Sequence, residues 1–236
     1  TAHEFERRDQ FSTIDIVTFA GNVSGDTSRR NAEKLLSNLD ADLSHVRIVD
    51  TAAVPQRFSQ LPSIHGNDGM GDLLSLRPHA IPIISYAEFV EDLPTRPTVL
   101  SLGPLTVTVD LLARLQPEEL IIMAGLVAET PNFNGYEFNH FLDRPAFAQA
   151  VLYPHVVATL DTCRAPRFNM IDRKGQAGGL IGRLIDRAIA LAAARHPDNC
   201  YIYDYVAAQY LTDPHGFTVD YAVDPWGNRL HQLQGK

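Results

Sequence analysis

The chain has 236 residues, of which 45% are hydrophobic and 20% charged, which is ordinary for a soluble globular protein and compatible with one large α/β domain. Its formal net charge of -8 argues against nucleic acid or an anionic membrane surface as the main partner, and leaves small-molecule and cation sites open. The two cysteines, Cys163 and Cys200, form no CxxC pair, and no apolar run is long enough to span a membrane, so we expect a cytoplasmic protein without a disulfide framework.

Hydrophobic patterning predicts strands that alternate with helices along most of the sequence. The predicted strands are residues 14–20, 46–49, 98–102, 119–123 and 156–160. The predicted helices are residues 26–39, with Asp26 or Thr27 as the cap, 106–115, 146–152, 180–196 and 204–211. A closing hairpin is predicted from residues 217–223 and 229–233. The alternation predicts an α/β fold with a single domain over residues 1–236, in which helices flank a mostly parallel, Rossmann-like sheet.

The segment Glu137-Phe138-Asn139 follows the predicted strand that ends at Met123. Open α/β sheets bind their ligands at the carboxyl ends of the strands, and residues two apart on a following loop can point the same way. A Glu side chain can accept two hydroxyl hydrogen bonds, and an Asn side chain both donates and accepts. This chemistry fits a sugar diol better than a phosphate or an apolar ligand.

Two further segments of the first half carry polar groups. Asn22 follows the turn at Gly21 and is expected to project its amide into the ligand crevice, although a simple turn role is the alternative. The loop from about residue 56 to 78 is too long for a plain connection, and its glycine-rich part around His65 is expected to be mobile and to close over a substrate. A surface turn cluster is the alternative for this loop.

Two other positions offer oxygen ligands or a proton. The free carbonyl of Leu102, at the end of a predicted strand, is the hard-oxygen type of ligand that Ca²⁺ accepts, or else belongs to an ordinary strand-to-helix turn. Asp204 is either a helix N-cap or a carboxylate ligand of a metal. Tyr203 beside it is able to donate a proton or to stack on a base, with a packing role as the alternative.

In this order, these segments resemble the inosine-uridine nucleoside hydrolase family from about Ile14 to Phe217. Asn22 falls at the family's valine-alanine-glycine-asparagine turn. The other matching segments are Arg30-Asn31-Ala32, Ile64–Gly71, Gly103-Pro104-Leu105-Thr106, Ile122-Met123-Ala124-Gly125, Glu137-Phe138-Asn139 and Asp204 with residues 207–214. Each motif alone is weak, and the ordered set is specific.

The resemblance implies hydrolysis of the N-glycosidic bond of a nucleoside, which gives ribose and a free base through an oxocarbenium-like transition state. It implies a bound Ca²⁺ held by Asp204 and the Leu102 carbonyl, and Tyr203 as the acid for the leaving base, where many members have a His. The implied substrate contacts are Asn22, His65, Met123, Asn132, Glu137, Phe138 and Asn139. Asn132 stands next to Pro131, which occupies a position where the family often has a ribose-binding Asn.

The main departure is an aspartate cluster of the form DxDxGxDD, which in the family supplies two calcium carboxylates and the general base. Counted back from Asn22, this cluster and the first strand would precede Thr1, and residues 1–9 resemble an exposed helical face instead. We therefore expect the natural gene to encode the cluster upstream and to specify an active N-glycosidase. The alternatives are a catalytically inactive ribosyl-binding or assembly protein of the same fold and, more remotely, an unrelated doubly wound sugar-binding protein. The expected assembly is a homodimer or homotetramer.

Overall fold

The computed structural model describes residues 11–60, 62–73, 81–176 and 178–236. The chain divides into two compact units, each of which is made of segments that are separated in sequence. The first unit is formed by Thr1–Val54, Phe58–Leu93 and Met170–Cys200, and the second by Pro55–Arg57, Pro94–Asn169 and Tyr201–Lys236. The single domain expected for residues 1–236 stays a prediction.

The first unit contains a three-stranded parallel sheet with the order β1-β2-β3. Its strands are β1 (Ile14–Thr18), β2 (Val46–Asp50) and β3 (Ile83–Ser85). Helix α2 (Gly25–Ser37) buries Leu36 against Leu43, Val46 and Ile48 of this unit. The other helices of the unit are α3 (Pro62–His65), α4 (Tyr86–Glu91) and α9 (Gly179–Ala193).

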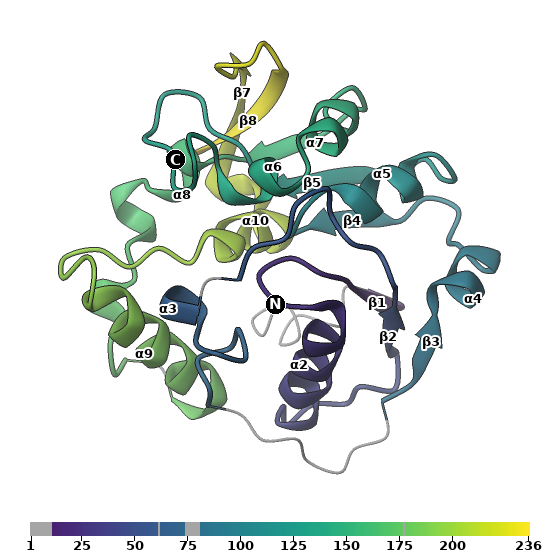
Figure 1. The fold of residues 1–236 in the computed structure, drawn as a ribbon, viewed down its shortest axis with the longest axis horizontal. Coiled ribbons are helices and arrows are strands. Elements are labelled where there is room, and N and C mark those ends of the chain that lie inside the picture. Colours follow the sequence, from purple (N-terminus) through teal and green to yellow (C-terminus); the bar gives the residue numbers. More distant parts are fainter. Residues whose placement is uncertain (1–10, 61, 74–80, 177) are drawn as a thin grey trace. The chain divides into compact units, whose positions relative to one another are not determined.

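The second unit contains a five-stranded sheet with the order β4-β5-β6-β8-β7 (Figure 1). Its strands are β4 (Thr98–Ser101), β5 (Glu119–Met123), β6 (Val156–Ala158), β7 (Phe217–Val223) and β8 (Arg229–Gly235). The neighbours β4, β5, β6 and β8 pair in parallel, and β7 pairs with β8 in the antiparallel direction. Because β4, β5 and β6 are parallel, their carboxyl ends lie at the same edge of the sheet.

Helices cover both faces of this second sheet. Leu120 and Ile122 of β5 pack with α5 (Thr106–Leu112) and α7 (Arg144–Ala150), whereas the alternating residues Ile121 and Met123 pack with α8 (Leu160–Cys163) and α10 (Tyr203–Thr212). These four apolar side chains of β5 are buried, which explains why the strand is a continuous apolar run rather than an alternating one. Each such side chain contributes about 1.5–3 kcal/mol through burial.

The α/β fold class and the mostly parallel strand order predicted from the sequence are confirmed. Three local predictions differ from the structure. Ser24, not Asp26 or Thr27, caps α2, since its hydroxyl accepts a hydrogen bond from the Thr27 N–H. Asp204 is not a helix N-cap, because Ile202 occupies that position of α10. The sequence pattern also missed β3 and the short helices α3, α4, α6 (Phe138–Leu142) and α8. The expectation for residues 1–9 lies outside the described residues, as do residues 61 and 74–80 of the predicted glycine-rich loop.

No helix in the described ranges combines the length and the hydropathy that a bilayer crossing requires.

An aromatic cluster of the second unit surrounds His140 on α6 (Phe138–Leu142). The His140 ring stacks on Phe147 at a centroid distance of 4.1 Å and meets the edge of Trp226 at 4.7 Å. Its Nδ1 atom is buried and has no hydrogen-bond partner among the described residues. Burial of the ring lowers the pKa of His140 to about 4, with Asp224 and Arg144 acting on it in opposite directions.

We predict that His140 makes the folded chain sensitive to acid. Below its usual pKa the unfolded chain protonates this ring, whereas the folded chain keeps it neutral down to about pH 4. The stabilisation is therefore complete above about pH 6.5 and is lost as the pH falls towards 4, an effect on the order of 3 kcal/mol. A His140→Phe variant keeps an aromatic ring and has no proton to gain.

Urea unfolding between pH 7 and pH 4 measures this effect in the wild type and in the variant. The unfolding free energy of His140→Phe is expected to fall less steeply with acid than that of the wild type. Equal slopes for the two proteins would show that His140 does not cause the acid sensitivity.

Candidate functional site

The candidate site lies in the second unit, at the carboxyl ends of β4 and β5. Met123 is the last residue of β5 and is buried, and Leu102 directly follows β4. The Nδ2 atom of Asn139 donates hydrogen bonds to the Met123 carbonyl at 3.0 Å and to the Leu102 carbonyl at 3.4 Å. The Asn139 side chain therefore bridges the two strand ends, and its amide presents Oδ1 as the acceptor for a further partner.

Glu137 is the N-cap of α6 rather than a residue of an open loop. Its Oε1 accepts a hydrogen bond from the Asn139 N–H at 2.9 Å. Its Oε2 accepts from the His140 N–H at 2.9 Å and from the Gly125 N–H at 3.0 Å. A carboxylate has about four lone-pair positions, so backbone groups use most of them and one position on Oε1 is left for a ligand hydroxyl. The sequence predicts that Glu137 accepts two hydroxyl hydrogen bonds from a ligand.

Gly125 makes this arrangement possible. Its φ of +79° lies in the left-handed region, and a Cβ atom at this position would lie 3.0 Å from the ring of Phe147. A larger residue would therefore be strained in the backbone and crowded by the core. With glycine in place, the chain turns directly after β5 and directs its N–H group to Glu137.

Two carboxyl groups share this poorly solvated region. Burial raises the pKa of Glu137 to about 7, although three backbone N–H groups favour its ionised form, and the charge of Asp204 raises it further. Burial also raises the pKa of the Asp204 carboxyl, on the second residue of α10, to about 6. The buried thiol of Cys163 lies within the field of both groups, and burial raises its pKa well above the usual value. Such a region favours a shared proton or a bound positive charge.

Tyr203 begins α10 and lies beside a cation. The Arg164 Nε atom is 3.4 Å from the phenol oxygen of Tyr203, and the guanidinium carbon is 5.9 Å from the centre of its ring. A guanidinium group only donates hydrogen bonds, so the phenol oxygen accepts in this contact, and the phenol keeps its own hydrogen as a donor. Arg164 is itself fixed, because its Nη1 donates to the Glu129 carboxylate at 2.8 Å and to the Thr130 carbonyl at 2.7 Å.

Asp161 of α8 holds the segment that contacts Arg164. Its carboxylate accepts hydrogen bonds from the N–H groups of Val127, Ala128 and Glu129 at 2.7, 2.7 and 3.0 Å. Neither Asp161 nor Arg164 is among the residues predicted from the sequence. The position of Asp161, shortly after the carboxyl end of β6, is the kind of position where α/β folds carry functional groups. Its hydrogen-bond partners lie more than 30 residues away along the chain, so the sequence does not reveal them.

Two predicted substrate contacts of the second unit have ordinary structural surroundings. Asn132 is exposed, and its backbone N–H donates to the Tyr136 carbonyl at 3.1 Å. Phe138 is buried and packs edge to face on Phe133 at a centroid distance of 5.1 Å. Phe138 therefore supports the helix that carries Asn139. The substrate roles of Asn132 and Phe138 stay predictions.

The remaining predicted contacts, Asn22 and His65, belong to the first unit. Asn22 is exposed in a tight turn that the Gly21 N–H closes on the Val23 carbonyl at 3.0 Å. His65 ends α3, and burial together with Arg195 lowers the pKa of its ring. Their roles at a substrate also stay predictions.

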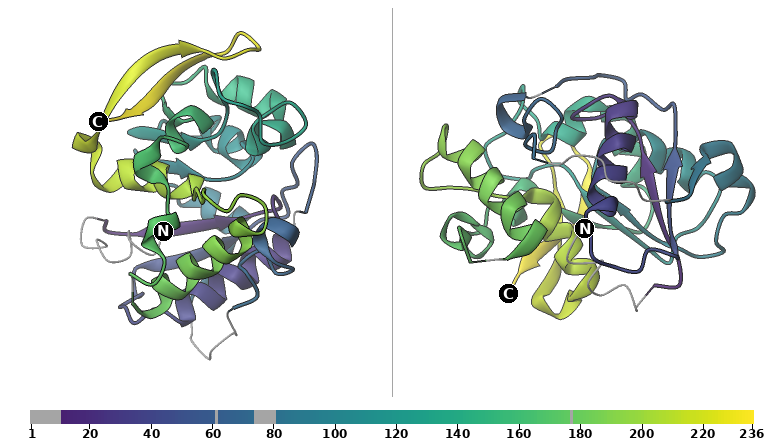
Figure 2. Two further views of the ribbon diagram at one scale, coloured as in Figure 1. Left: turned by 90° about the vertical axis from the view of Figure 1, so that its left-hand side faces the viewer. Right: turned by 90° about the horizontal axis from the view of Figure 1, so that it is seen from below.

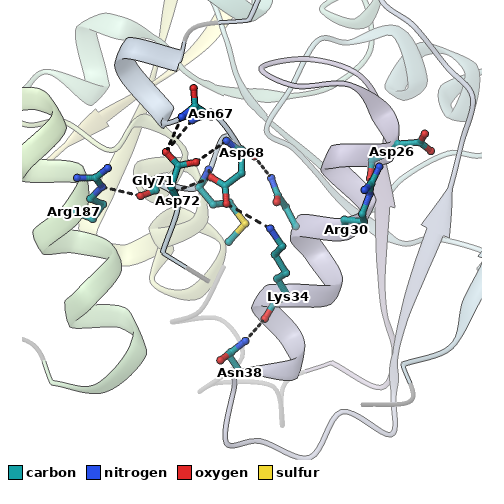
Figure 3. Close-up of polar contacts among 11 residues, drawn as sticks. Asp26, Arg30, Lys34, Asn38, Asn67, Asp68, Gly71, Asp72 and Arg187 are labelled. Carbon is teal, nitrogen blue, oxygen red and sulfur yellow. Dashed lines mark hydrogen bonds and ion pairs between the residues drawn. The ribbon is translucent and has the colours of Figure 1, made fainter. Parts of the chain in front are cut away.

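The glycine-rich loop after His65 forms a compact turn over residues 66–72 (Figure 3). The Asp72 carboxylate accepts hydrogen bonds from the N–H groups of Asn67 and Asp68 at 3.1 and 2.9 Å, which lowers its pKa. Gly69 has a φ of +80°, and a Cβ atom there would lie 2.5 Å from a methyl group of Val23. The turn therefore requires glycine at this position and packs against the turn that contains Asn22.

Two helices of the first unit hold the same turn, as Figure 3 shows. From α2, Asn31 donates to the Asp68 carbonyl at 2.6 Å, and Lys34 forms an ion pair with the Asp68 carboxylate at 3.6 Å. From α9, the Arg187 Nε atom donates to the Gly71 carbonyl at 2.7 Å. The loop is thus anchored on both sides, and its closure over a substrate stays a prediction.

The donor groups for a metal ion are only partly present. Within the described ranges, no group of three or more His, Cys, Asp or Glu side chains is placed to hold a metal ion. Asp204 and the Leu102 carbonyl are hard oxygen donors of the kind that Ca²⁺ prefers, but Ca²⁺ takes about six to eight of them. The oxygen donors are of the type that Ca²⁺ binds, but the described residues do not supply enough of them to complete its coordination shell.

The chain is similar to known proteins along most of its length. The family model for inosine-uridine preferring nucleoside hydrolase matches residues 3–229. The chain is 29% identical over 238 residues to the non-specific ribonucleoside hydrolase RihC of Salmonella schwarzengrund (strain CVM19633), a match that covers 86% of this chain and 71% of that protein.

Solved structures share the fold at lower identity. The purine-preferring ribonucleoside hydrolase from Gardnerella vaginalis matches with a TM-score of 0.68 and 20% identity, over 100% of this chain and 85% of that chain. The inosine-uridine preferring nucleoside hydrolase from Bacillus anthracis matches with a TM-score of 0.61 and 15% identity, over 95% and 81%. These structures show the fold, and the family model covers most of the chain. The chain therefore belongs to the inosine-uridine preferring nucleoside hydrolase family.

Proposed function

We propose that this chain is a ribonucleoside N-glycosidase, which hydrolyses the bond between the base and ribose. The observation that supports this most strongly is the convergence of Glu137, Asn139 and Asp204 at the carboxyl edge of β4 and β5. Family membership and the nucleoside hydrolase relatives support the same function.

The ribose diol is proposed to bind at two acceptors. Glu137 Oε1 and Asn139 Oδ1 each accept one hydroxyl hydrogen, and the buried Met123 side chain packs against the sugar. The oxocarbenium-like transition state carries positive charge on the ribose ring. The carboxylates of Glu137 and Asp204 stabilise this charge when they are ionised, because they act in a region of low solvation where their field is strong.

Tyr203 is proposed to protonate the leaving base. Arg164 donates to the phenol oxygen, so the phenol hydrogen is not used in that contact and serves as the proton that is donated to the base. Asn22, His65, Asn132 and Phe138 are proposed as further contacts to the substrate, following the family resemblance.

Ca²⁺ is proposed as the metal, with Asp204 and the Leu102 carbonyl among its ligands. When bound, such an ion holds hydroxyl oxygens and lowers the pKa of a water. The protein is further proposed to be cytoplasmic and to form a homodimer or homotetramer, with a nucleoside rather than nucleic acid or a membrane as its partner.

A hydrolysis assay on the full natural protein tests the proposed function. Inosine and uridine are expected to release ribose, while a 2′,3′-dideoxynucleoside with the same base is expected to be a much poorer substrate because it lacks both hydroxyls. Binding of ribonucleosides without release of ribose would favour an inactive ribosyl-binding protein. Equal turnover of the dideoxy compound would contradict the diol site.

We predict that Tyr203→Phe lowers kcat by about 100-fold or more, the usual contribution of a positioned general acid, with little change in KM. The loss is expected to be smallest for nucleosides whose bases leave without protonation. Tyr205→Phe on the same helix is the matched control and is expected to keep wild-type kcat. An unchanged rate in Tyr203→Phe would rule out the acid role.

A calorimetric titration with CaCl₂ tests the metal assignment without relying on turnover. The full natural protein is expected to bind the ion, and Asp204→Asn is expected to weaken binding at least tenfold because one anionic ligand is lost. Asp213→Asn, beyond the carboxyl end of α10, is the control and is expected to bind like the wild type. Equal binding by Asp204→Asn would remove Asp204 from the ligand set.

A further inference from the structure

Arg164 carries hydrogen-bond donors that the described part of the chain does not use. Its Nη1 atom donates to the Glu129 carboxylate and the Thr130 carbonyl, and its Nε atom donates to the phenol oxygen of Tyr203. Within the described residues, no atom accepts a hydrogen bond from Nη2. The side chain is 21% exposed and the Nη2 atom is not buried, so a ligand is able to reach this donor.

The planar guanidinium group determines the direction of the free donor. In arginine, the Nε–H bond and one Nη2–H bond are parallel and form one edge of the fork. Because Nε faces the phenol oxygen of Tyr203 at 3.4 Å, the Nη2–H bond on that edge points to the same side. The phenol keeps its own hydrogen for another partner. The phenol O–H and the Nη2–H of Arg164 are therefore neighbouring donors.

The guanidinium group is anchored in the absence of a ligand. Its two bonds from Nη1 end on residues 129 and 130, and the Asp161 carboxylate holds the N–H groups of residues 127–129. The guanidinium carbon also lies 5.9 Å from the centre of the Tyr203 ring. An arginine whose direction is fixed in advance loses little side-chain freedom when it donates to a ligand.

These donors belong to the region that contains the proposed ribose contacts. Tyr203 precedes Asp204 on α10, which packs against the sheet of the second unit and against α8, and which is yellow-green in Figure 2. One buried thiol on α8 lies within the field of Glu137, Asp204 and Arg164. A nucleoside whose ribose binds at Glu137 is therefore able to bring its base to the two donors.

Purine bases differ in what they offer to two neighbouring donors. Hypoxanthine and guanine present two acceptors side by side, N7 and O6, whereas adenine presents the N7 acceptor beside a 6-amino donor. A guanidinium group only donates, so it matches the oxo group and opposes the amino group.

We propose that Arg164 is a specificity-determining residue that recognises the 6-position of the base. Its Nη2 atom donates to O6 while the Tyr203 phenol donates to N7, and the site thereby selects 6-oxopurine ribonucleosides over adenosine. Adenosine is rejected because its amino group faces the Nη2 donor and leaves that donor without an acceptor. This assignment rests on the proposed function and adds the class of base to it.

Direction rather than charge is the basis of this selection. The Glu129 carboxylate lies 2.8 Å from the Arg164 Nη1 atom and compensates its charge. The pair therefore does not favour an anionic ligand such as a nucleotide phosphate. What Arg164 offers to a ligand is a donor of fixed direction, which suits the carbonyl oxygen of a neutral base.

The kcat/KM values of the full natural protein for inosine, purine riboside and adenosine test the proposal. Purine riboside carries only hydrogen at the 6-position, so the expected order is inosine, purine riboside, adenosine. Inosine is expected to exceed adenosine by about 10- to 100-fold, the discrimination typical of a bidentate contact to a base. This ratio is expected to fall by about tenfold or more in Arg164→Met, which has no donor, and in Arg164→Lys, which keeps the charge without the planar fork.

Arg114→Met, at an exposed ion pair with Asp110 on α5, is the control and is expected to keep the wild-type ratio. A purely structural role of Arg164 would lower all three values by the same factor, and an unchanged ratio in Arg164→Met would overturn the proposal.

Absence of ribose release from all three nucleosides would contradict the hydrolase function separately. Calorimetric titration with inosine and with adenosine then tests the recognition of the base by itself. Tighter binding of inosine that is lost in Arg164→Met would support the role of Arg164, and equal binding or no binding of the two nucleosides would overturn it.

Discussion

The capping of α6 by the Glu137 carboxylate is the interaction on which the candidate site depends. This group accepts the N–H of Gly125, directly after β5, and those of Asn139 and His140 in the first turn of α6. A buried carboxylate without such donors would be strongly disfavoured. The three bonds fix the start of the helix against the end of the strand, and so place the Asn139 amide between the Met123 and Leu102 carbonyls.

The site then separates into an acceptor side and a donor side. Glu137, Asn139 and Asp204 present oxygen atoms, which suit hydroxyl hydrogens and positive charge. Arg164 and Tyr203 present hydrogens, which suit a leaving base. Helix α8 supports the donor side, because Asp161 holds the backbone of residues 127–129 and that segment holds Arg164. This region of the second unit therefore carries both hydrogen-bond acceptors and donors, the combination that the proposed cleavage of a glycosidic bond uses.

The sequence predicted the elements whose signals are local. The apolar run of β5 and the hairpin strand β7 have the predicted limits, because burial and turn residues mark them directly. Ser24, Asp26 and Thr27 are all good capping residues, so only the observed bond identifies Ser24 as the cap of α2. The role of Asp204 depended on where α10 begins, which sequence patterns locate poorly. The hydrogen-bond partners of Asp161 and those of Arg164 are distant in sequence. Neither can be obtained from residue spacing.

The most direct test of a diol site formed by Glu137 and Asn139 is an NMR titration with a C-nucleoside, which keeps the ribose diol and has no N-glycosidic bond to cleave. The account predicts that the amide resonances of Gly125, Asn139 and His140 shift with the ligand, because their N–H groups bond to the carboxylate that accepts the hydroxyl. The corresponding dideoxy compound should leave them in place. Saturating binding that shifts other amides and leaves these three unchanged would contradict the account.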